Sequence, residues 1–194
     1  RLRREIGDLT GARAALQRAA EIDASDAGLQ DELGQVFEAC GEVESALAAY
    51  RAAVSLDPHC DAYQRRLGAL LRDCGDSDGA AAALRAALEL RPESAETYGE
   101  LAELLWRSGE HEQALEAYRR AHLLAPTSAE NVRALGLAYG RLGRARDAER
   151  LLRQAVDLAP ERAELHYDAG VAAEAIEQWD LALTVYEQAA TLAP

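Results

Sequence analysis

The chain has 194 residues and is rich in Ala and Leu, with 43 and 29 copies against only 10 of Val and Ile together. Ala and Leu favour helix, whereas sheets favour β-branched residues, so this composition excludes an all-β sandwich. The basic residues are 21 Arg without a Lys, and the formal net charge is −13. Such acidity argues against bulk binding to nucleic acid or anionic lipid. No stretch approaches the roughly 20 apolar residues that cross a bilayer.

A period of 34 residues runs through the sequence and predicts its organisation. All the prolines follow this spacing, at Pro58, Pro92, Pro126, Pro160 and Pro194. Two alanine series keep the same spacing: Ala46, Ala80, Ala114, Ala148 and Ala182, and Ala53, Ala87, Ala121, Ala155 and Ala189. A glycine series breaks only at its last member: Gly41, Gly75, Gly109, Gly143 and then Glu177. The predicted division is one array, with a partial repeat 1–26 and repeats 27–60, 61–94, 95–128, 129–162 and 163–194.

Each repeat is predicted to form two helices. In 95–128, apolar spacing indicates a first helix over 96–108 and a second over 112–124. Gly109 supplies the left-handed turn between them, so Glu177 should cost about 1 kcal/mol if it adopts that conformation. The eighth position of each repeat is small, which lets the two helices approach closely: Gly34, Gly68, Ala102, Gly136 and Gly170.

These features resemble the tetratricopeptide repeat family, whose pattern places Leu-Gly, aromatic, Ala and Pro residues at fixed offsets. Residues 27–60 carry it as Leu33-Gly34, Phe37, Ala46, Tyr50, Ala53 and Pro58. The resemblance covers the whole chain and implies an all-α, right-handed solenoid of stacked helix-turn-helix repeats. We expect the array to be cut at both ends, so that further repeats, another domain or a second copy would cover the terminal apolar faces.

Catalytic motifs for nucleophilic, nucleotide-dependent or zinc-dependent chemistry are missing from the sequence, so we expect no enzyme activity, no cofactor and no metal site. His166 stands where Tyr98 stands in another repeat and is predicted to pack as an aromatic substitute. The segment from Asp76 to Gly79 is interpreted as a helix cap and not as a calcium loop. The three cysteines, Cys40, Cys60 and Cys74, are interpreted as reduced structural thiols, and we expect a cytoplasmic location.

The resemblance implies a concave groove, lined by the first helices, that holds a peptide or partner segment. Repeat 27–60 would contribute Asp31, Gln35 and Glu38. The residues predicted to contact the partner are Arg65, Arg72, Glu103, Trp106, Arg107, Arg133, Leu137, Arg141, Tyr167 and Val171. Aromatic and apolar members would anchor the partner, and arginines would bind its carboxylates. Two alternatives stay open: Trp106 folds over its own helix end, or opposite charges pair between neighbouring repeats and fix their stacking.

The function expected from this resemblance is a non-catalytic scaffold that binds a protein or peptide. One alternative is the recruiting arm of a larger enzyme such as a protein O-glycosyltransferase or kinase. Another is a scaffold that self-associates through its terminal faces. The Lys and Asn clamp of chaperone-binding relatives is replaced here, for example by Gly99 and Glu103, so binding of that kind is not expected.

Overall fold

The computed structural model describes residues 9–193, and over this range the backbone forms eleven α-helices and no strand. The helices fall into two compact units, unit 1 (residues 1–92) and unit 2 (residues 93–194). Unit 1 contains α1 (Leu9–Ile22), α2 (Ala27–Ala39), α3 (Val43–Leu56), α4 (Asp61–Asp73) and α5 (Ser77–Leu90). Unit 2 contains α6 (Ala95–Arg107), α7 (His111–Leu124), α8 (Ala129–Arg141), α9 (Ala145–Leu158), α10 (Ala163–Glu174) and α11 (Trp179–Leu192).

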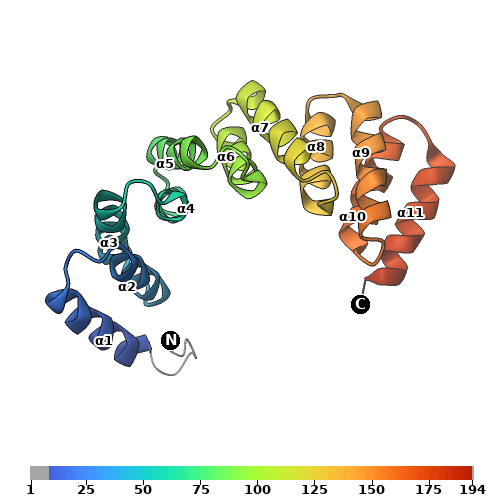
Figure 1. Ribbon diagram of the computed structural model, residues 1–194. Coiled ribbons are helices and arrows are strands. Elements are labelled where there is room, and N and C mark those ends of the chain that lie inside the picture. The colour runs from blue at the N-terminus through green and yellow to red at the C-terminus, as the bar shows by residue number, and fades with distance from the viewer. Residues whose placement is uncertain (1–8, 194) are drawn as a thin grey trace. The chain divides into compact units, whose positions relative to one another are not determined.

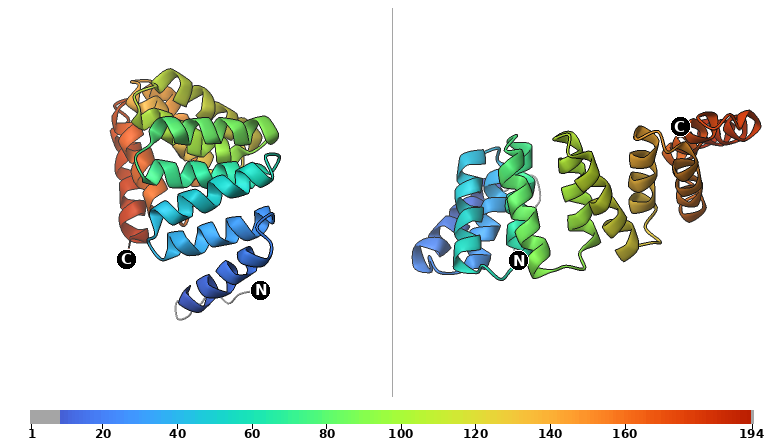
Figure 2. Two further views of the ribbon diagram at one scale, coloured as in Figure 1. Left: turned by 90° about the vertical axis from the view of Figure 1, so that its left-hand side faces the viewer. Right: turned by 90° about the horizontal axis from the view of Figure 1, so that it is seen from above.

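Successive helices pair as antiparallel hairpins, α2 with α3 through α10 with α11 (Figures 1 and 2). Helix α1 packs on α2 at the start of unit 1. In the repeat used above as an example, α6 and α7 begin and end within one residue of the predicted bounds. The predicted all-α architecture of stacked helix pairs is therefore confirmed.

The turn between the helices of a pair depends on one residue with a positive φ. After α6, Gly109 has φ 83° and donates its N–H to the Trp106 carbonyl at 3.2 Å. The next residue, Glu110, donates its N–H to the Leu105 carbonyl at 2.9 Å. Together these bonds form a Schellman motif, which satisfies the last carbonyls of the helix. Glu177 makes the same turn after α10 with φ 62°, so the left-handed conformation considered from the sequence is the one it adopts.

Side-chain caps mark the starts of several first helices. Ser94 and Ser128 each accept a hydrogen bond from the N–H three residues further on, and Asp26 does the same before α2. Before the second helix α5, the Asp76 carboxylate accepts from the Gly79 N–H at 2.9 Å. Because such a bond satisfies one of the orphan donors of the first turn, the interpretation of 76–79 as a helix cap is confirmed.

The core combines the periodic small residues with buried leucines and a tyrosine, among them Leu84, Leu151 and Tyr50. The alanine series that begins at Ala46 is no more than 4% exposed, and the series that begins at Ala53 no more than 9%. At the eighth position, a Cβ added to Gly34 would lie 2.5 Å from the ring of Tyr50, so only glycine allows α2 and α3 to come this close. His166 is buried, as predicted for an aromatic substitute, and its Nε2 lies 2.8 Å from the Pro160 carbonyl. None of the described helices is long and apolar enough to span a membrane.

Candidate protein-binding site

The predicted contact residues are divided between the two units. Arg65 and Arg72 lie on α4 of unit 1, and the other eight lie on α6, α8 and α10 of unit 2. These three are the first helices of successive pairs, as the resemblance implied. Unit 2 therefore carries most of the candidate site, and its geometry is described by itself.

Trp106 occupies the last turn of α6 and is half-buried. Its ring packs on the ring of His111, at the start of α7, with the centroids 4.6 Å apart. The ring of Tyr118, about two turns further along α7, has its centroid 6.5 Å from that of Trp106. From the next pair, the Arg141 guanidinium lies over the indole at 5.5 Å from its centroid, in cation–π geometry. Trp106 thus packs partly against its own hairpin and partly against α8, where Arg141 joins it.

Arg141 also lies at the edge of an open cavity of about 280 Å³ between α8, α9 and α10. Two more of the predicted residues, Leu137 and Val171, line this cavity. The remaining lining residues are mostly small or aliphatic: Gly136, Gly140, Ala145, Ala148, Leu152, Asp168, Ala172 and Ala175. The structure therefore brings Trp106, Arg141, Leu137 and Val171 into one continuous strip, called here the apolar strip.

A comparison of residues 34 positions apart explains why this cavity is open. Gly140 and Ala145 occupy the positions that Trp106 and His111 occupy one repeat earlier. The earlier repeat fills the space at the helix turn with two rings that pack at a tilt, whereas this repeat has only a hydrogen atom and a methyl group there. Neither Gly140 nor Ala145 is among the predicted contact residues, because that prediction rested on side chains able to contact a partner and not on missing ones. Comparing equivalent positions between repeats is the signal that could have found them.

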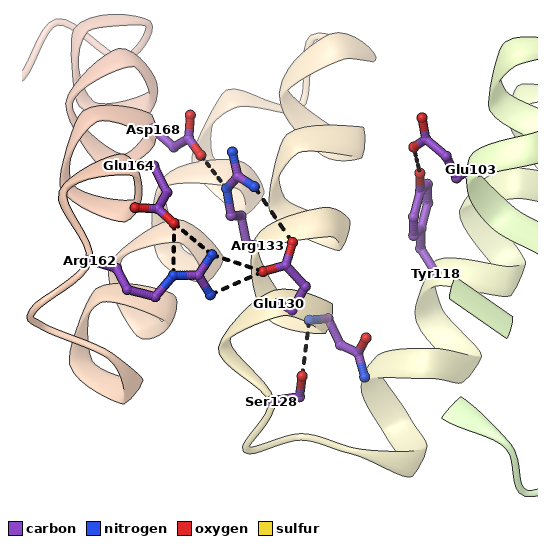
Figure 3. A network of polar contacts seen from close by, with 9 residues as sticks. Glu103, Tyr118, Ser128, Glu130, Arg133, Arg162, Glu164 and Asp168 are labelled. Atoms are coloured by element: carbon purple, nitrogen blue, oxygen red, sulfur yellow. Dashed lines mark hydrogen bonds and ion pairs between the residues drawn. The ribbon is translucent and has the colours of Figure 1, made fainter. Parts of the chain in front are cut away.

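Arg133 lies in a network with acidic residues of its own helix pair and of the next helix pair (Figure 3). Its Nε lies 2.6 Å from Oδ2 of Asp168 on α10, and its Nη1 lies 3.6 Å from Glu130. Arg162 adds a second cation, with its guanidinium 3.0 Å from Glu130 and 2.7 Å from Glu164. For Arg133, then, the structure supports the second open alternative, in which opposite charges pair between neighbouring repeats.

Glu103 and Arg107 also have partners within unit 2. The Tyr118 hydroxyl donates to Glu103 at 3.0 Å, which Figure 3 shows, and Arg107 pairs with the same carboxylate at 3.1 Å. Burial, together with the Glu103 charge, raises the pKa of Tyr118 well above its usual value. The Tyr118–Glu103 hydrogen bond therefore ties α6 to α7 beside Trp106, and the Arg107–Glu103 pair runs along α6.

Tyr167 is exposed on α10, and its ring lies 5.7 Å from that of Tyr186 on α11. The Tyr186 hydroxyl donates to Glu174 at 3.0 Å. Burial and this carboxylate raise the pKa of Tyr186 to about 12. Tyr167 and the half-exposed Val171 both lie on α10 and offer a partner apolar contact area.

In unit 1, the first helices carry mainly polar interactions. Arg72 pairs with its neighbour Asp73 at 2.9 Å, and Arg65 is half-buried on the same helix. The expectation that Asp31 faces a groove is wrong, because Asp31 is only 5% exposed and pairs with Arg66 of the next hairpin. The ion pair with Arg66 offsets the cost of burying this carboxylate, so Asp31 connects α2 to α4.

The described residues include no group of three or more metal-ligating side chains. The three cysteines are free thiols. The features that stand out in unit 2 are an apolar cavity and an arginine stacked on an indole, which can bind a side chain.

The fold is shared with solved structures at low sequence identity. The crystal structure of MamA protein is 23% identical, with a TM-score of 0.77, and the match covers 86% of this chain and 91% of that one. YrrB, described as a TPR protein with an unusual peptide-binding site, is 23% identical with a TM-score of 0.76, covering 94% of both chains. BtubC (BKLC) from P. vanneervenii is 17% identical with a TM-score of 0.81, covering 97% of this chain and 89% of that one.

No curated protein matches the sequence. Family models do match, and each is described as a tetratricopeptide repeat. They cover residues 27–70, 65–94, 93–161 and 133–194, which together extend over every full repeat of the chain. The helix pairs, the glycine turns and the buried alanines described above are the physical basis of these matches. The chain belongs to the tetratricopeptide repeat family.

Proposed function

We propose that unit 2 is a non-catalytic protein-interaction module that binds an extended peptide, or an extended segment of a partner protein, along α6, α8 and α10. The observation that carries this proposal is the apolar strip, which joins a half-buried indole, a stacked arginine and an open cavity on three successive first helices. Exposed aromatic and aliphatic groups beside a pocket are typical of the centre of a binding interface.

Two further observations support an elongated occupant. Trp106 lies on α6, Leu137 on α8 and Val171 on α10, so the strip continues from one hairpin to the next. An extended segment can follow such a strip from one hairpin to the next. YrrB, which has the same fold, is described as having a peptide-binding site, and this agrees with the use proposed for this chain.

The test is a selection of peptides from a phage-displayed random library on the immobilised chain, followed by measurement of each binder's affinity. The variant Leu137→Glu with Val171→Glu places two charges on the strip and should weaken selected peptides by about tenfold or more. Its matched control is Leu123→Glu with Leu183→Glu, which alters two exposed leucines on α7 and α11 outside the strip. If no peptide is selected, or if the two variants bind equally well, the proposed function is wrong.

A further inference from the structure

The cavity beside Arg141 is an apolar space that the side chains of its own repeat leave unfilled. One repeat earlier, Trp106 and His111 fill the equivalent space with rings 4.6 Å apart. In the cavity, Gly140 and Ala145 take these places, while Leu152 and Ala148 of α9 form its floor. A Cβ added at Gly140 would lie 3.6 Å from the Cβ of Ala148, an ordinary contact, so packing of the backbone does not require glycine there. The glycine leaves space that a side chain could occupy.

The size of the cavity suits one large side chain. An engineered apolar cavity of about 150 Å³ already accommodates benzene. At about 280 Å³, this cavity can hold an aromatic ring together with the carbon that joins it to a backbone. Its volume lies just below the range for ligand pockets, roughly 300–1,000 Å³, so a single side chain fits it better than a larger cofactor does.

The positive charge of Arg141, which lines the cavity, indicates that the occupant also carries a carboxylate. Arg107 and Arg133 of the neighbouring first-helix positions are already paired with carboxylates, at 3.1 and 2.6 Å. Asp168 also lines the cavity, but Arg133 holds it. Arg141 is exposed, stacks on the face of Trp106 and acts electrostatically on Tyr118, but no carboxylate of residues 9–193 forms an ion pair with it. Because stacking leaves the guanidinium edge free, its N–H groups can bind an incoming carboxylate.

From these observations we propose that the cavity receives an aromatic side chain of the bound segment, while Arg141 binds an Asp or Glu carboxylate within two residues of it. This proposal rests on the proposed function and specifies its partner: a peptide motif that combines one aromatic residue with one acidic residue. The aromatic ring would replace the Trp106–His111 pair that the repeat lacks, and the carboxylate would complete the ion pair that Arg141 lacks. An aliphatic occupant, or a purely apolar one, is an outcome that the test distinguishes.

The experiment uses the full chain and the peptides selected from the random library. The motif should be enriched among them, and two variants should each weaken motif-bearing peptides by about tenfold or more. The first, Gly140→Trp with Ala145→His, rebuilds in this repeat the ring pair of the preceding one and so fills the cavity. The second, Arg141→Glu, reverses the charge at its mouth.

Each variant has a matched control outside the cavity. Ala190→Trp adds the same ring at an exposed position of α11, and Arg150→Glu makes the same charge reversal at an exposed position of α9. The controls should retain wild-type affinity. Arg141→Glu changes an exposed side chain, so it keeps the test decisive even if the cavity-filling variant misfolds, which circular dichroism would reveal.

The outcomes separate this proposal from the proposed function. Peptides that lose affinity in Leu137→Glu with Val171→Glu, but lack the motif, would overturn the aromatic–acid proposal and leave peptide binding intact. Enrichment of aliphatic residues in place of aromatic ones, or full binding to Arg141→Glu, would overturn it as well. A selection that yields no peptide would overturn both.

Discussion

At position 177 the chain places a glutamate in a turn that four earlier repeats make with glycine. Its φ of 62° lies in the left-handed region, where the Cβ of any L-residue other than glycine crowds the following carbonyl. We therefore predict that Glu177→Gly raises the free energy of unfolding by about 1 kcal/mol, even though it removes a side chain. Chemical denaturation followed by circular dichroism measures this change.

The reciprocal control is Gly143→Ala, where φ is 73° and nothing lies within 4 Å of an added Cβ. It should destabilise the chain by a similar amount for the same reason, with no contribution from packing. If Glu177→Gly fails to stabilise while Gly143→Ala destabilises, the backbone at 177 does not keep its positive φ in solution.

Tyr186 gives a prediction about pH at the same scale. Burial and the neighbouring Glu174 raise its pKa from 10.0 to about 12 in the folded chain. The folded state therefore favours the protonated phenol, and this contribution to stability is complete below pH 10 and lost as the pH rises through about 12. Between pH 10 and about 12, the free energy of unfolding should therefore fall less in Tyr186→Phe than in the wild type.

The measurement is a series of denaturation curves for both proteins across the interval from pH 10 to 12. Glu174→Gln provides the control, because it removes the charge that helps to raise the pKa and should move the loss to lower pH. If the free energy of unfolding falls equally with pH in the wild type and in Tyr186→Phe, the pKa of this phenol is not raised by folding.

At the scale of the helix pair, the eighth position decides how closely two helices pack. In α2, a Cβ at Gly34 would lie 2.5 Å from the Tyr50 ring, and Tyr50 is 1% exposed, so the ring has no free space into which to move. We predict that Gly34→Ala destabilises the chain by about 1–3 kcal/mol through overpacking. Thermal or chemical unfolding of the variant checks the value.

Gly99 in α6 offers the opposite case for comparison. Nothing lies within 4 Å of the Cβ that alanine would add there, and the residue is helical. Gly99→Ala should therefore stabilise the chain by about 0.5–1 kcal/mol, because alanine loses less backbone entropy than glycine does. If both substitutions had the same sign, the close approach at position 34 would not control the packing of α2 on α3.

The fold could be predicted from the sequence because its determinants are local and periodic. Gly109 fixes a turn, Pro126 follows a helix end, and Ala114 and Ala121 mark the buried face, whatever the rest of the chain does. The candidate site was predicted only in part. Arg133 and Arg141 occupy equivalent-looking exposed positions in the sequence, yet one is held by Asp168 and the other stacks on Trp106. Which partner each arginine finds depends on three-dimensional distances that the repeat pattern does not contain.

Across the molecule, ion pairs connect one hairpin to the next within each unit. Asp31 pairs with Arg66 in unit 1, and Arg133 pairs with Asp168 in unit 2; both pairs join first helices of successive hairpins. Since each repeat of such an array contacts only its neighbours, these pairs contribute to the interface terms that make the repeats of a unit unfold together. A chain with a net charge of −13 thus places part of its limited positive charge between repeats.

This arrangement predicts that ion pairs between hairpins are worth more than ion pairs along one helix. The side chains of Arg133 and Asp168 are 27% and 14% exposed, with atoms 2.6 Å apart, whereas those of Arg107 and Glu103 are 67% and 46% exposed. A double-mutant cycle of Arg133→Ala and Asp168→Ala should give a coupling free energy of about 1–2 kcal/mol. The cycle for Glu103→Ala and Arg107→Ala should give about 0.3–0.5 kcal/mol, as for exposed pairs one turn apart. Chemical denaturation of each single and double variant supplies the values, and equal couplings would show that the pairs between hairpins do not stabilise the stack.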